Sequence, residues 1–172
     1  MAMELLAEIS EADFGARQDR LVEYSIRKAA RAVLFDQDHR VALLALQKPG
    51  LHKVPGGILR PGETAEHGLK REVMESTGFA IKIGEPLGAV IEYRDAYRKM
   101  QISYCYIAHT MGKSKGSHFT KEDVDQGAKL VWMPLDEAIH TISREKPPIP
   151  EGKYIVRREL ILLKRAKEMK YR

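Results

Sequence analysis

Runs of apolar residues along the chain predict a set of buried strands. Residues 29–35 and 41–47 are two such runs, and they flank the polar segment Asp36-Gln37-Asp38-His39. Two apolar runs joined by a short polar turn are typical of a β-hairpin. After the middle of the chain, further strands are predicted at residues 80–83, 87–93, 100–110 and 130–133.

A different periodicity predicts helices. Ala65, Leu69 and Val73 recur at intervals of four and would form the buried face of a helix over residues 64–77. Gly78 follows this segment, where a glycine in the left-handed conformation commonly ends a helix. Two more helices are predicted, at residues 135–143, directly after Pro134, and at residues 151–169.

The order of these elements predicts an α/β fold. Strands and helices are mixed without strict alternation, which favours a mixed β-sheet lying between helices. The length of 172 residues is that of a single domain, taken here as residues 1–172. Residues 1–26 form an N-terminal extension with three open alternatives: a short helix, a short strand, or a segment that mediates a homodimer.

Composition excludes several classes of protein. The hydrophobic content of 44% is ordinary for a folded domain, and no apolar run is long enough to cross a bilayer. The acidic N-terminal segment lacks the layout of a secretion signal, so cytoplasmic localisation is the default expectation. Cys105 is the only cysteine, which rules out an internal disulfide and favours a buried core thiol.

The net charge of +5 raises the question of a nucleic-acid partner. Residues 143–172 contain ten Lys or Arg and four Glu, whereas residues 1–142 contain nineteen basic and twenty acidic residues. The excess therefore belongs to the predicted C-terminal helix, whose apolar positions indicate a packed helix with a solvated basic face. A nucleic-acid partner is disfavoured on this distribution, and attraction of polyanions is the alternative.

The predicted helix over residues 64–77 carries a row of carboxylates. Glu72 and Glu75 are three residues apart and share a face, and position 76 completes the same edge. Hard oxygen ligands on one edge suit Mg²⁺, which keeps several waters and leaves room for substrate phosphates. A solvated acidic face is the alternative for two glutamates considered alone.

Residues 57–79, GILRPGETAEHGLKREVMESTGF, resemble the Nudix box, G-x5-E-x7-R-E-U-x-E-E-x-G-U, in which U is apolar. The matching positions are Gly57, Glu63, Arg71, Glu72, Val73, Glu75, Gly78 and Phe79. One fixed position differs, because Ser76 replaces the second glutamate of the Glu-Glu pair. The likeness extends, less specifically, over residues 27–168 and includes Val54-Pro55-Gly56-Gly57.

This resemblance implies a Nudix-type α/β/α sandwich with a mixed sheet and a set of site residues. Glu72, Glu75 and the backbone carbonyl of Gly57 would hold Mg²⁺, with Mn²⁺ as the alternative ion. Arg71 would orient its neighbours through Glu63. Ser76 would supply a poorer ligand than a carboxylate and remove one negative charge.

The general base has two candidate locations. It would be Glu72, within the box, or a carboxylate of the later segment 120–127, where Glu122, Asp123 and Asp125 are the candidates. Each of these three is also explained as an exposed loop charge. Gln126 occupies a place where similar chains often carry glutamate.

Three basic residues are candidates for substrate binding. Arg94 lies in an aromatic and basic cluster near a turn, where it would contact phosphate or stack on a base. Lys113 and Lys115 lie in a glycine-rich segment and would meet substrate phosphates. A solvated hairpin tip is the alternative for these two lysines.

Two functions follow from the resemblance. The first is Mg²⁺-dependent hydrolysis of a nucleoside diphosphate linked to another group, such as a nucleoside triphosphate or an oxidised nucleotide. The partner would then be a small molecule of nucleotide type. The second is a catalytically weakened Nudix-fold module that binds a nucleotide or RNA, and Ser76 is its main support.

Overall fold

Eight strands form one mixed sheet in the computed structural model, which describes residues 3–17 and 21–170. The strands are β1 (Leu5–Ile9), β2 (Ser25–Phe35), β3 (Arg40–Leu46), β4 (Leu51–Lys53), β5 (Gly56–Ile58), β6 (Ala80–Arg94), β7 (Lys99–Met111) and β8 (Ala128–Pro134). Their order is β1-β6-β7-β2-β3-β4, with β5 paired to β2 and β8 to β3. The β1–β6 and β2–β7 pairs are parallel, and the other pairs are antiparallel.

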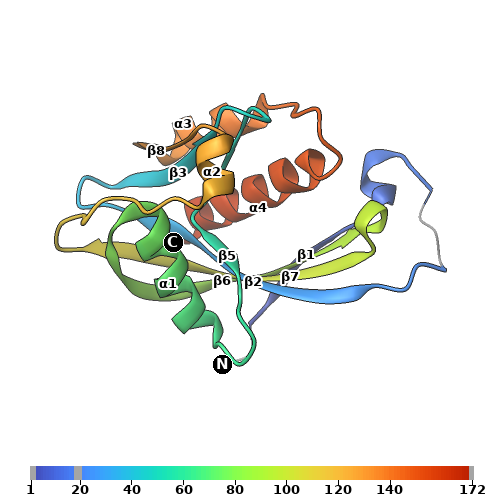
Figure 1. Cartoon of the computed structure of the whole chain (residues 1–172), viewed down its shortest axis with the longest axis horizontal. Helices are drawn as coiled ribbons and strands as arrows, with labels where there is room; N and C mark the ends of the chain where they lie inside the picture. Colours follow the sequence, from blue (N-terminus) through green and yellow to red (C-terminus); the bar gives the residue numbers. More distant parts are fainter. Residues whose placement is uncertain (1–2, 18–20, 171–172) are drawn as a thin grey trace.

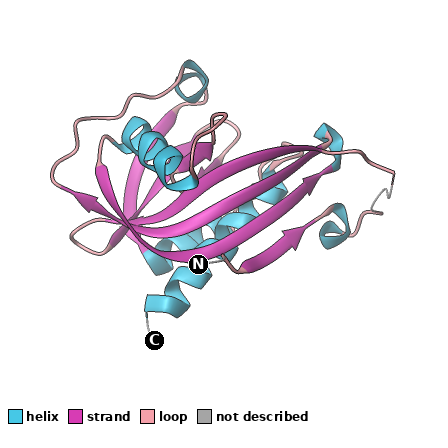
Figure 2. Ribbon diagram, turned by 90° about the horizontal axis from the view of Figure 1, so that it is seen from below, coloured by secondary structure: helices cyan, strands magenta, loops and turns pink. Residues whose placement is uncertain are grey.

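Helices cover both faces of this sheet (Figures 1 and 2). They are α1 (Ala65–Thr77), α2 (Lys121–Asp125), α3 (Leu135–Ser143) and α4 (Gly152–Lys170), with short 3-10 turns at Glu11–Phe14 and Asp95–Tyr97. Helix α1 packs against β2, β5 and β6, whereas α4 packs against α3, β1, β2, β4 and β6. The expected α/β/α sandwich is therefore confirmed.

The alternation of side chains along β2 explains why the sheet has a hydrophobic core on each of its two faces. Val33 and Phe35 point into a core shared with α3 and α4. Ala32 and Leu34 point into a second core, where they meet Leu69 and Val73 of α1. Since successive side chains of a strand face opposite sides, one central strand supplies both cores. Burial on both faces also explains why β2 reads as a nearly continuous apolar run.

Most predicted elements are present, with two corrections. The strands expected at residues 80–83 and 87–93 are one strand, β6, which stays continuous through two register shifts around Pro86. The segment 120–127 contains the short helix α2 and is not a simple loop. The predicted hairpin is present, because β2 and β3 pair antiparallel at Phe35 and Val41, and β5 pairs with β2 further along.

The N-terminal extension forms β1 and a 3-10 turn over its described part, and residues 1–2 and 18–20 lie outside the described residues. Cys105 is fully buried as expected, and burial raises the pKa of its thiol to about 12. No helix in residues 3–17 or 21–170 has the length and apolar character needed to span a membrane.

Candidate active site

Helix α1 holds the acidic edge in place because both of its ends are capped. The Thr64 hydroxyl accepts a hydrogen bond from the His67 backbone N–H at 3.2 Å. At the other end Gly78 adopts φ 74° and its N–H donates to the Met74 carbonyl at 2.9 Å. Such caps satisfy backbone groups that the helix itself leaves unpaired. Leu69 and Val73 anchor the buried face, so Glu72 and Glu75 lie partly exposed beside it.

Arg71 links the acidic side chains into one network. Its Nε and Nη2 donate to the two carboxylate oxygens of Glu63 at 2.8 and 2.9 Å. Its Nη1 donates to Glu72 at 2.8 Å and lies 3.7 Å from Glu75. Arg71 Nη2 also donates to the Ile58 carbonyl at 3.2 Å, which ties the helix to β5. The predicted contact of Arg71 with Glu63 is therefore present, and it fixes the guanidinium against both other glutamates.

Glu63 is held as a carboxylate by these contacts. The Arg71 side chain, followed by the Arg60 backbone N–H, lowers the pKa of Glu63 to about 2. Because the pKa of Glu63 is lower in the folded state, its carboxylate stabilises the fold. The stabilisation is complete at pH values above the ordinary carboxyl pKa of 4.5 and is lost as the pH falls towards 2.

We therefore expect Glu63→Gln to melt below the wild type at pH 7 and the difference to shrink as the pH falls from about 4.5 to 2. Thermal unfolding followed by circular dichroism at a series of pH values measures this difference. Glu66→Gln, at an exposed position in the first turn of α1, is the matched control. A melting difference that stays constant down to pH 2 would contradict the assignment.

The two glycines of β5 leave space for neighbouring atoms to lie close to its backbone. A Cβ on Gly57 would lie 2.5 Å from the Glu72 carboxylate, so the missing side chain leaves the space that this carboxylate occupies. A Cβ on Gly56, which has φ 143°, would lie 2.2 Å from the Ala30 carbonyl and 2.7 Å from Arg31 Cα. The Gly-Gly pair is thus required by the packing of β5 against α1 and β2.

Ser76 directs its hydroxyl at the helix backbone. Its Oγ donates to the Glu72 carbonyl at 3.0 Å, a common arrangement for serine within a helix. No three His, Cys, Asp or Glu side chains within the described part of the chain are grouped as a metal site.

The residues present nevertheless fit one Mg²⁺. This ion is commonly held by one or two carboxylates, waters and substrate phosphates. Glu72 and Glu75 would supply the carboxylates, and the space beside Gly57 keeps the Glu72 carboxylate next to the β5 backbone. The chemistry of this donor set suits a single ion shared with substrate better than a dense metal cluster.

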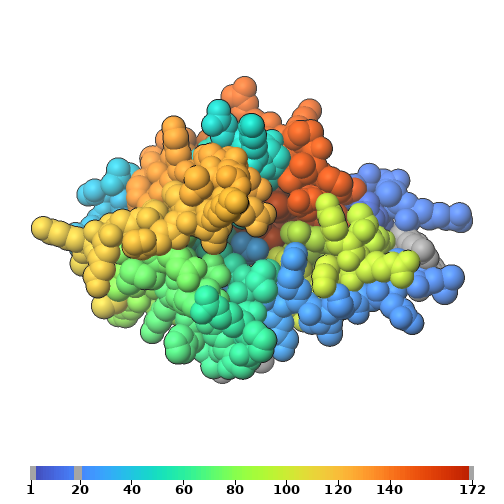
Figure 3. All heavy atoms as spheres, viewed as in Figure 1, coloured from blue at the N-terminus to red at the C-terminus, as the bar shows by residue number. Residues whose placement is uncertain are grey.

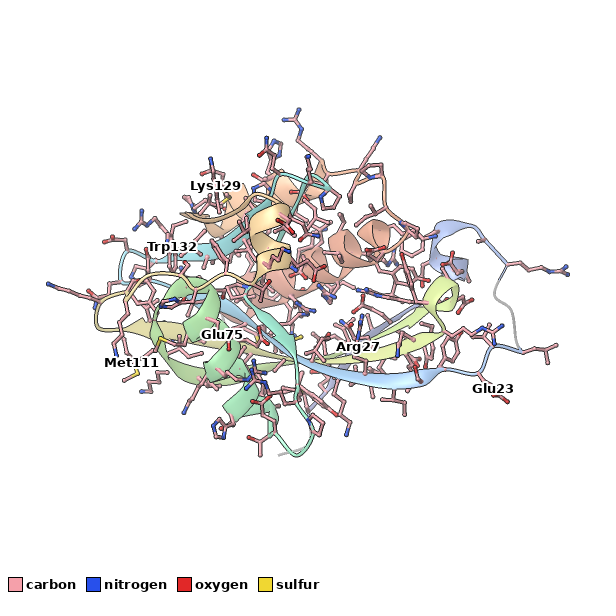
Figure 4. The ribbon with its side chains drawn as sticks, in the orientation of Figure 1. Glu23, Arg27, Glu75, Met111, Lys129 and Trp132 are labelled. Atoms are coloured by element: carbon pink, nitrogen blue, oxygen red, sulfur yellow. The ribbon has the colours of Figure 1, made fainter. Side chains whose placement is uncertain are left out.

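A cavity of about 310 Å³ lies on the other side of β5 from α1, and Gly56 and Gly57 form part of its wall. Figure 3 shows a hollow in this region, between the α2 segment in gold and the α1 and β5 segments in green. In Figure 4, Glu75 of α1 and Arg27 of β2 lie on either side of β5. Two predicted site residues, Glu122 and Arg94, line the cavity, and Arg94 donates to Glu92 at 2.8 Å.

Lys113 and Lys115 are not among the lining residues. They lie in the exposed segment that follows β7, and the Lys115 backbone N–H donates to the Gly78 carbonyl at the C-terminal end of α1. Their predicted contact with substrate phosphates would have to form at that end of the helix. Asp123 lines the cavity, while Asp125 does not.

Four other basic residues of the described chain line the cavity and were not singled out from the sequence: Arg27, Arg31, Lys53 and Arg158. The sequence does contain a signal for Arg31, which interrupts the apolar run at residues 29–35. A charged residue in a buried strand is rare unless it is paired or functional. Lys53 and Arg27 carry no comparable signal because they lie near strand ends.

Comparisons with known proteins match this chain to one family. A model of the NUDIX domain matches residues 25–158. A MutT-like protein of Streptomyces ambofaciens is 27% identical over 105 residues, which cover 61% of this chain and 62% of that protein, less than two thirds of its length. The 25 kDa subunit 2 of pre-mRNA cleavage factor Im of Arabidopsis thaliana is 28% identical over 167 residues, covering 85% of this chain and 80% of that protein.

The fold is shared with solved structures. A NUDIX hydrolase from Nitrosomonas europaea superposes with a TM-score of 0.62 over 86% of this chain and 90% of that chain, at 16% sequence identity. At this identity the likeness concerns the arrangement of helices and strands.

Proposed function

The chain belongs to the NUDIX domain family, and on that premise we propose that it is a pyrophosphohydrolase that cleaves a nucleoside diphosphate linked to another group, with Mg²⁺ as its metal and Mn²⁺ as a substitute. The observation that carries the proposal is the position of Glu72. Its carboxylate lies between the Arg71 guanidinium and the space left by Gly57, and Gly57 in turn lines the basic cavity. A cytoplasmic setting and a homodimer stay predictions.

Each residue then has a defined task. Glu72, Glu75 and the Gly57 carbonyl would hold Mg²⁺, which would neutralise charge on the diphosphate when bound. Arg71 keeps the carboxylates of Glu63 and Glu72 oriented through the bonds described above. The proton of the attacking water goes to a carboxylate, for which Glu72 and Glu122 are the candidates. Glu122 is exposed and lines the same cavity as Gly57, which supports its candidacy.

A weakened enzyme that acts mainly as a binding module is the second candidate. The hydroxyl of Ser76 donates to the backbone, where a complete box would present a third carboxylate. One relative is named as a subunit of a pre-mRNA cleavage factor, which is not the name of a small-molecule hydrolase. These two observations favour a test that restores the missing carboxylate.

We expect the wild type to hydrolyse at least one member of a panel of nucleoside triphosphates, oxidised nucleotides, dinucleoside polyphosphates and nucleotide sugars. Release of phosphate, pyrophosphate and monophosphate is measured with Mg²⁺, with Mn²⁺ and with excess chelator. We further expect Ser76→Glu to raise kcat/KM by about tenfold at limiting Mg²⁺, because a further carboxylate strengthens metal binding. Ser143→Glu, in the last turn of α3, adds the same charge away from the site.

Turnover that survives the chelator would contradict metal dependence. A silent wild type with activity gained in Ser76→Glu would favour the binding module. Silence of both proteins across the whole panel would overturn the proposal of hydrolysis.

A further inference from the structure

The cavity behind β5 contains paired and unpaired cations. Two of its arginines are neutralised by buried carboxylates. Arg158 donates to Glu92 at 3.0 Å and to Glu159 at 2.5 Å. Arg94 donates to Glu92 at 2.8 Å. Both glutamates are fully buried, so their charge is used within the protein.

Three further cations line the same cavity without a carboxylate partner among the described residues. Arg27 donates its Nε to the neutral Gln101 amide at 2.9 Å. Arg31 and Lys53 make no hydrogen bond or ion pair through their side chains with any residue in 3–17 and 21–170. Three cations therefore face the cavity without a salt bridge to any described carboxylate, and such cations attract anions.

Arg31 is the deepest of the three. It is 7% exposed, and its Nε is buried without a hydrogen-bond partner. Burial, helped by repulsion from Arg158, lowers its pKa to about 10. Burial also lowers the pKa of Lys53, helped by Arg31 and Arg158. An unpaired buried cation is costly for the fold, and a retained one points to a ligand that supplies the missing anion.

The rest of the lining disfavours a nucleobase. None of the described residues that line the cavity is Phe, Tyr, Trp or His, so a base would find no aromatic ring on which to stack. Three carboxylates, Glu122, Asp123 and Glu151, also line it. Asp123 attracts Lys53 and Glu151 attracts Arg27 through space, yet within the described residues none of the three forms a salt bridge with these cations. Glu151 instead accepts a hydrogen bond from the Tyr97 hydroxyl at 2.6 Å.

We propose that this cavity binds a phosphate monoester carried by the substrate in addition to its diphosphate, with Arg31 and Lys53 as the phosphate-binding residues. The inference rests on the proposed function. Gly57 lines the cavity and also lies against the Glu72 carboxylate, so a phosphate in the cavity would lie beside the bond that is hydrolysed. The preferred substrate is then a diphosphate whose second moiety is a phosphorylated sugar or polyol. A dianionic phosphate matches the unpaired charge, and guanidinium and ammonium groups are its usual ligands in proteins.

Direct binding tests the cavity without any need for turnover. Ribose 5-phosphate is titrated calorimetrically into the metal-free protein with excess chelator, and ribose serves as the neutral matched ligand. We expect the wild type to bind ribose 5-phosphate and not ribose, and Arg31→Gln to weaken this binding by about 10- to 100-fold, as for loss of a charge-assisted hydrogen bond. Arg165→Gln is the control, because Arg165 pairs with Glu4 and Glu168 and does not line the cavity.

Kinetics tests the same residue in hydrolysis. Two substrates are compared that differ only in a phosphate on the sugar linked to the nucleoside diphosphate. We expect Arg31→Gln to raise KM about 10- to 100-fold for the phosphorylated substrate and to leave KM for the other unchanged. Equal increases for both substrates would mean that Arg31 holds the diphosphate itself, and would overturn the proposal.

Stability separates this role from a structural one. Removing an unpaired buried charge should leave the melting temperature of Arg31→Gln equal to that of the wild type or above it. A lower melting temperature together with unchanged affinity for ribose 5-phosphate would overturn the proposal. If the wild type hydrolyses no substrate but binds ribose 5-phosphate through Arg31, the anion site is supported and only the proposed function is contradicted.

Discussion

Replacing Glu72 by glutamine is expected to lower kcat/KM by about 10²- to 10⁴-fold, the range associated with loss of a catalytic base or of a charge that stabilises the transition state. The glutamine amide fits the space beside Gly57 and its oxygen can still accept a hydrogen bond from Arg71. The substitution removes the negative charge that would bind the metal or take the proton from water. The melting temperature should therefore change little while the activity falls.

Steady-state kinetics on the best substrate of the panel measures this loss, together with a thermal melt of each variant. Glu66→Gln is the matched control, since Glu66 is exposed in the first turn of the same helix. Its kcat/KM should remain within about twofold of the wild type, as is usual for an exposed side chain away from the site. Equal activities of the two variants would show that Glu72 has no role in hydrolysis.

The helix that carries Glu72 could be predicted from the sequence because local signals determine it. Thr64 caps the N-terminus, Gly78 caps the C-terminus, and Leu69 and Val73 mark the buried face. Each of these effects acts within a few residues along the chain. The same reasoning gave the bounds of α3, which the structure reproduces as residues 135–143.

The continuity of β6 could not be predicted because distant residues determine it. Gly84 and Pro86 are strand breakers by local rules, and they lie between the two strands predicted at residues 80–83 and 87–93. In the structure a Cβ on Gly88 would lie 2.4 Å from Leu6, so the glycine admits the parallel strand β1 from the far end of the sequence. Pairing with β1 and β7 keeps the strand intact through its irregular register.

The site was predicted in part for the same reason. The carboxylates of α1 lie within one short segment, where spacing alone shows that they share a face. The cavity combines Arg31 from β2, Lys53 from β4, Glu122 from α2 and Arg158 from α4. No spacing along the chain relates these residues, and the pairing of β5 with β2 brings them together.

We expect Arg158→Met to lower the free energy of unfolding by about 3–5 kcal/mol. This is the usual cost of removing one partner from a buried ion pair. Arg158 is 1% exposed and lies between Glu92 and Glu159, which are both fully buried. Burial alone would raise the pKa of Glu92, but Arg158 and Arg94 together lower it, so the group is held as a carboxylate. Without Arg158 this buried negative charge loses its main partner.

The same substitution should also disturb the active site. Glu159 accepts a hydrogen bond from the Val54 backbone N–H at 3.1 Å, and Val54 leads directly into the Gly-Gly pair of β5. Loss of Arg158 leaves Glu159 without the arginine that orients it, so the backbone beside Gly57 becomes less firmly held. We therefore expect kcat/KM to fall together with stability, in contrast to the Glu72 variant, whose stability is retained.

Urea unfolding measures the free-energy change, and an unchanged m-value would show that both proteins unfold by the same transition. Arg165→Met is the control on the same helix, because Arg165 pairs with the exposed Glu4 and Glu168. Such exposed pairs contribute about 0–1 kcal/mol. If both variants lost equally little stability, the buried arginine would not hold α4 to the sheet. The cavity would then depend on packing by Leu162 and Leu163, which are fully buried against the same face.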